Sequence, residues 1–151
     1  MDKNLALGHL GKAIASHIKW VEDIKRIIDG EDVESVEVNA TECGFGAWFL
    51  DEGQKLSAIK TVPKDSMDLI NTLHNKVHDV YLNIHAIYFD VEKKSLLKRL
   101  MQRKKKIEPK EVETAKAYFK ELEKISFDLL EELRRLERRA YAFPESDFQL
   151  L

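Results

Sequence analysis

An uninterrupted apolar seam near the end of the chain is the feature that most constrains its fold. Between residues 112 and 140, steps of three and four residues alternate without a slip through Val112, Ala115, Phe119, Leu122, Ser126, Leu129, Leu133, Leu136 and Ala140. Such a heptad pattern marks one face of a long α-helix. Ile125 and Leu130 widen this face, as packing inside a bundle requires. The seam therefore predicts a last helix over about 109–141.

Two earlier segments show the same helical spacing. The first covers residues 5–29, with Gly30 as its C-terminal stop. The second starts after Pro63 and is expected to reach about residue 104, although the pattern leaves open whether residues 86–107 continue it. Between these two segments, "VESVEV" is interpreted as a turn or short extended piece. A short helix around Cys43 is expected to be capped by Thr41 and to end at Gly53.

These elements predict an all-α protein, an antiparallel four-helix bundle with a short extra helix around Cys43. The length of 151 residues fits one domain over residues 1–151, with a core of about 10–140 and a tail at 142–151. With 6 Gly and 3 Pro, the chain has too few turn formers for a β-sandwich or barrel.

Composition and charge exclude several functional classes. The net charge of -2 gives no general attraction to nucleic acid, and the basic run at 98–106 lacks interleaved aromatic residues. No apolar run reaches the roughly 18 residues that span a bilayer, and the N-terminus lacks a signal-peptide core. The single cysteine cannot form an internal disulfide. We therefore expect a cytoplasmic protein that binds neither nucleic acid nor membranes.

The stretch "TLHNKVHDVY" places His74 and His78 four residues apart, on one face of the second long helix. Alone, the pair fits a partly buried polar face as well as a metal site. His17 lies beside the apolar stripe of the first helix, and Cys43 supplies a thiol. Imidazole nitrogen and thiolate sulfur are the ligands that zinc prefers. A lone inward histidine is more often a hydrogen-bonded core residue, but three with one thiol favour zinc.

Four sequence motifs together resemble the chemoreceptor zinc-binding (CZB) domain family. They are "HIKW" at 17–20, "CGFGAW" at 43–48, "HNKVH" at 74–78 and the Ser-x-x-Leu stretch "SFDLLEEL" in the last helix. The resemblance implies one Zn²⁺ held by His17, Cys43, His74 and His78. It also implies a small helical bundle that senses zinc or oxidants such as hypochlorous acid, in chemotaxis and related signal transduction, often as a dimer. In that family such domains are attached to chemoreceptors or diguanylate cyclases, or stand alone.

The sequence contains neither a chemoreceptor signalling hairpin nor a cyclase domain, so a stand-alone member is expected to signal through a partner protein or a homodimer. Four protein ligands leave zinc no open position for substrate or water, and no Ser-His-Asp set, phosphate loop or H-E-x-x-H helix is present. We therefore expect no enzyme and no catalytic residues. Trp20 and Trp48 are expected to wall the site. His9 and His85 stay outside the predicted ligand set, although His85, two turns beyond His78, could replace a ligand.

Three functional hypotheses remain. The leading one is a zinc-binding sensory module with redox or zinc sensing. The second is a purely structural, zinc-stapled dimerisation or interaction domain, which needs the same four residues. The third is a hemerythrin-like di-iron bundle. Such a site needs further carboxylate and histidine ligands at helical spacing, and this sequence offers no such partners for His74 and His78.

Overall fold

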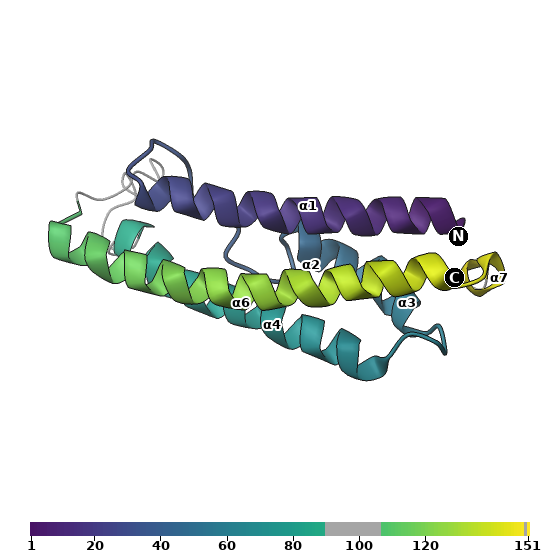
Figure 1. The fold of residues 1–151 in the computed structure, drawn as a ribbon. Coiled ribbons are helices and arrows are strands. Elements are labelled where there is room, and N and C mark those ends of the chain that lie inside the picture. Colours follow the sequence, from purple (N-terminus) through teal and green to yellow (C-terminus); the bar gives the residue numbers. More distant parts are fainter. Residues whose placement is uncertain (90–106, 150) are drawn as a thin grey trace.

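Three long helices form most of the molecule (Figure 1). They are α1 (Lys3–Ile28), α4 (Lys64–Phe89) and α6 (Pro109–Ala142). This computed structural model describes residues 1–89, 107–149 and 151. Helices α1 and α4 run in the same direction, and α6 runs back between them and packs against both. The all-α bundle is confirmed for the described residues, which form no strand.

The ends of the long helices follow the local signals in the sequence. Asp2 caps α1 by accepting the Leu5 N–H at 3.0 Å, and Gly30, with φ of 83°, ends that helix as predicted. Helix α6 begins at Pro109, behind a capping box of Glu108 and Glu111. The predicted continuation of α4 to residue 104 lies outside the described residues.

The fourth place in the bundle is filled by one short helical segment, made of α2 (Gly44–Trp48), a π-helical turn η1 (Phe49–Gly53) and α3 (Gln54–Ser57). It packs against α1 and runs antiparallel to it (Figure 1). The predicted bounds of this short helix are wrong. Cys43, and not Thr41, is the capping residue, because its Sγ accepts the Gly46 N–H at 3.2 Å. Gly53 has helical dihedrals, so the segment continues to Ser57.

The predicted tail is partly folded onto the bundle. It contains a short helix, α7 (Glu145–Phe148), and the Phe148 side chain is fully buried. The N-terminal ammonium of Met1 donates a hydrogen bond to the Phe148 carbonyl at 2.9 Å. The two ends of the chain therefore lie together at one end of the bundle (Figure 1).

The hydrophobic core consists of two clusters with a polar layer between them. One cluster lies towards the chain termini and includes Leu10, Ile70 and Leu133. The other includes Ile24 and Tyr81. Between them lie four buried polar side chains, each at most 4% exposed: His17, His74, His78 and Ser126. Buried polar groups need partners, and a bound ligand can supply them, so this layer is the candidate functional site.

Candidate metal centre

Two of the predicted ligands, His74 and His78, lie one turn apart on the buried face of α4. Their ring centroids are 4.8 Å apart with the planes at 74°, so the two rings meet edge to face. Both side chains are 3% exposed. Trp20 of α1 packs on His78 with a centroid distance of 4.4 Å. As predicted, Trp20 forms a wall of this layer.

Cys43 reaches the same layer from the start of α2. Its Sγ lies 3.3 Å from Nε2 of His74, a residue 31 positions away in the sequence. The turn that carries Cys43 depends on Gly46, because a Cβ at that position would lie 1.7 Å from the Ala40 carbonyl oxygen. The sequence C-x-x-G thus serves two purposes: Gly46 donates its N–H to the sulfur and permits the close approach of the chain.

His78 has the clearest hydrogen-bonding pattern of a metal ligand. Its Nδ1–H donates to the Val38 carbonyl at 3.0 Å, and a carbonyl can only accept, so Nε2 carries the lone pair. That Nε2 is buried and has no hydrogen-bond partner in the described part of the chain. Metal-bound histidines usually donate their other N–H to a carbonyl or carboxylate in this way. The Val38 carbonyl is a functional group that sequence patterns cannot reveal.

The structure brings together three of the four predicted ligands. One ligand atom of Cys43, one of His74 and one of His78 all lie within 4.8 Å of one another. His17 is adjacent, with its ring centroid 6.4 Å from that of His74, but its Nε2 is hydrogen-bonded to Ser126 Oγ at 2.9 Å. The nitrogen and sulfur donors suit Zn²⁺, and the unpaired Nε2 of His78 fits a metal-binding role. The complete tetrad stays a prediction.

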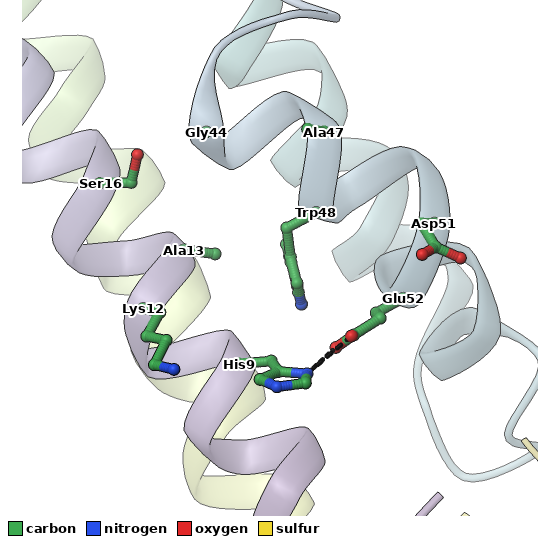
Figure 2. Close-up of a pocket in the computed structure, with 9 residues that line it drawn as sticks. All are labelled: His9, Lys12, Ala13, Ser16, Gly44, Ala47, Trp48, Asp51 and Glu52. Carbon is green, nitrogen blue, oxygen red and sulfur yellow. Dashed lines mark hydrogen bonds and ion pairs between the residues drawn. The ribbon is translucent and has the colours of Figure 1, made fainter.

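The two histidines outside the predicted set have other neighbours. His85 packs on Phe89 with a centroid distance of 5.2 Å. His9 Nδ1 lies 2.6 Å from a carboxylate oxygen of Glu52, which ties α1 to η1. Both residues line an open pocket of about 560 Å³. Figure 2 shows the His9–Glu52 pair at one edge of this pocket and the Trp48 ring between α1 and the short segment. Neither histidine belongs to the cluster.

This pocket adjoins the cluster along the chain. Ser16 and Gly44 line the pocket and are the sequence neighbours of His17 and Cys43 (Figure 2). Cys43 itself is only 7% exposed. Small solutes can therefore reach the backbone beside the thiol, while the sulfur stays inside the bundle.

Burial sets the protonation states of these side chains. It lowers the pKa of His17 to about 4 and that of His74 to about 3, and repulsion from neighbouring histidines adds to both shifts. Burial also lowers the pKa of His78 and raises that of the Cys43 thiol. At neutral pH the three histidines are uncharged and can donate lone pairs to a metal, whereas Cys43 holds a proton.

This pattern predicts how many protons a zinc ion displaces. The histidines have none to lose at pH 7.5, so binding is expected to release about one proton per ion, from Cys43. Affinity should accordingly rise about tenfold per pH unit between about pH 6 and 8. Titration calorimetry in two buffers of different ionisation enthalpy measures the number released. A release of three or four protons would show that the histidines are charged in the metal-free protein.

One comparison with known proteins bears on this cluster. Residues 17–84 match the family model of the chemoreceptor zinc-binding domain. The matched range starts at His17 and contains Cys43, His74 and His78. This segment is similar to chemoreceptor zinc-binding (CZB) domains. The family resemblance predicted from the motifs is thereby confirmed. No curated protein and no solved structure matches the chain.

The CZB match and the Cys43, His74 and His78 cluster together support zinc binding. The matched range ends within α4, so α6 and its Ser126 lie beyond it. None of the described helices is long and apolar enough to cross a membrane. For Ser126, the sequence held two signals: a hydroxyl in an otherwise apolar or small-residue seam, and a place at the start of the Ser-x-x-Leu stretch that contributed to the family resemblance.

Proposed function

We propose that this chain is a zinc-binding regulatory module, in which His17 joins Cys43, His74 and His78 around one ion. The observation that carries the proposal is the buried, unpaired Nε2 of His78 beside a thiol and a second imidazole. Leaving such a nitrogen unpaired costs about 1–3 kcal/mol, and a metal bond removes that cost. Chemically, zinc would supply a link between the segment around Cys43 and helices α1 and α4.

The sensing role rests on the several contacts of one sulfur. Cys43 Sγ caps α2 through the Gly46 N–H and lies next to His74. A metal-bound thiolate reacts with hypochlorous acid to give a sulfenic acid and chloride. The reaction would weaken the metal bond and the cap at once, so the chain from Ala40 to Gly46 would rearrange. A reducing, cytoplasmic setting suits such a thiolate.

The test loads the protein with zinc and adds one equivalent of hypochlorous acid. We expect one zinc per chain before treatment, a single added oxygen on Cys43 by mass spectrometry, and release of most of the zinc to a colorimetric chelator. A thiol reductant should restore binding, because sulfenic acid is reversible. This reversal is the control for oxidised methionines, which thiols do not repair.

Two other results would change the proposal. Zinc that stays bound beside an unreacted Cys43 would favour the structural dimerisation domain or a sensor of zinc level. A purified protein that binds no zinc would contradict both roles.

The output of the module is part of the proposal. The outer face of α6 exposes Phe127 and Tyr141, each 61% exposed and two heptad repeats apart. Large exposed aromatic side chains at this spacing suit contact with a second helix. The homodimer and the signalling partner stay predictions.

A further inference from the structure

Ser126 is a polar residue at a core position of α6 whose neighbours along the seam are apolar. It lies on the inner face of α6 between Leu122 and Leu129, both fully buried, and is itself 4% exposed. The hydrogen bond between its Oγ and His17 Nε2, at 2.9 Å, is the one that the described residues provide for this hydroxyl. Burying a hydroxyl costs free energy unless it forms a hydrogen bond, and the bond to His17 offsets that cost for Ser126.

The pairing resembles the one already seen at His78. There, Nδ1–H donates to a carbonyl and Nε2 is left with the lone pair. At His17 the bonded nitrogen is Nε2, and the acceptor is a hydroxyl oxygen. A ligating imidazole must present a lone pair on one nitrogen and usually donates the proton on the other. If Ser126 Oγ accepts the Nε2 proton, the nitrogen of His17 available to a metal is Nδ1.

We propose that Ser126 is a positioning residue of the metal centre, whose hydroxyl accepts the Nε2–H of His17 and thereby presents Nδ1 to the ion. The inference rests on the proposed zinc-binding function. It extends the site to α6, a helix outside the CZB match. Because the bond joins residues 109 positions apart, it also connects the ligand on α1 to the helix that exposes Phe127 and Tyr141.

The decisive readout is the position of the His17 proton in the metal-free protein. Long-range ¹H–¹⁵N correlation spectra distinguish the two imidazole tautomers, and we expect the Nε2–H form at pH 7.5. In Ser126→Ala the preference for this form should be lost. On zinc binding, the nitrogen whose shift reports coordination should be Nδ1 of His17. These spectra report tautomer and ligating atom directly, which a purely structural serine would not determine.

Zinc affinity supplies the second readout. Outer hydrogen-bond partners of metal ligands typically contribute tenfold to a hundredfold, so Ser126→Ala should weaken zinc binding at least about tenfold. The matched control is Ser66→Ala. Ser66 is also buried, 6% exposed, but its hydroxyl donates to Glu132. This control loses the same atom and a buried hydrogen bond, and its zinc affinity should stay within about twofold of wild type.

Three results would overturn the proposal: an Nδ1–H tautomer in the metal-free wild type, zinc bound through Nε2, or equal affinities for Ser126→Ala and Ser66→Ala. Failure of the proposed function looks different. If the wild type binds no zinc, the metal-free spectra still show whether Ser126 sets the tautomer of His17.

Discussion

His78→Ala is expected to weaken zinc binding by about 10²–10³-fold. Structural zinc sites bind with roughly 10–16 kcal/mol, so one of four ligands accounts for about 2.5–4 kcal/mol. The bond from Nδ1–H of His78 to the Val38 carbonyl already orients the ring, and its buried Nε2 has no other partner among the described residues, so the alanine variant loses a pre-positioned ligand. Competition titration with a chelator of known zinc affinity measures the change. His74→Ala and Cys43→Ala should behave in the same way.

The matched control for this prediction is His85→Ala, on the same helix two turns further on. His85 packs on Phe89 outside the cluster, so its loss should leave zinc affinity within about twofold of wild type. His9→Ala, which breaks the contact with Glu52, is a second control. If His9→Ala weakened binding as much as His17→Ala, the predicted ligand set would be wrong.

Gly46→Ala is expected to disrupt the metal centre without touching a ligand. Its Cβ would lie 1.7 Å from the Ala40 carbonyl oxygen and 2.9 Å from the Ala40 carbonyl carbon, so the backbone ahead of Cys43 must move. Such overpacking against backbone costs about 2–4 kcal/mol of unfolding free energy. Because the same movement displaces Cys43 Sγ from His74, zinc affinity should fall at least about a hundredfold. Denaturant unfolding and zinc titration measure the two effects.

Gly44→Ala is the matched control for that substitution, two residues away in the same turn. Its nearest contact would be the Ser16 Oγ, at 2.2 Å, and a hydroxyl can rotate away, so we expect a loss below about 1.5 kcal/mol and nearly unchanged zinc binding. Gly11→Ala, in open space on α1, should raise stability by about 0.5–1 kcal/mol. Equal effects of Gly46→Ala and Gly44→Ala would show that the close approach to Ala40 is not what the turn requires.

The helices were predictable from sequence because their signals are local. The spacing of apolar residues, Gly30 after α1 and Pro109 at the start of α6 all act within about one helical turn. The prediction that Thr41 caps the short helix failed because this cap is set by the fold and not by a local signal. Capping preferences rank hydroxyls highly, and Cys43 takes that role because the fold holds its sulfur against the Gly46 N–H.

The chemistry of the site was also present in the sequence, in the type and order of its residues. Two inward histidines, a third histidine and one thiol supply the donor atoms that zinc prefers, and the family resemblance implied the complete ligand set. What only the tertiary structure decided is which atoms meet. Cys43 and His74 are 31 residues apart, and His17 and Ser126 are 109 apart. No short-range pattern reports such distances, since they depend on which helix faces pack together and in what register.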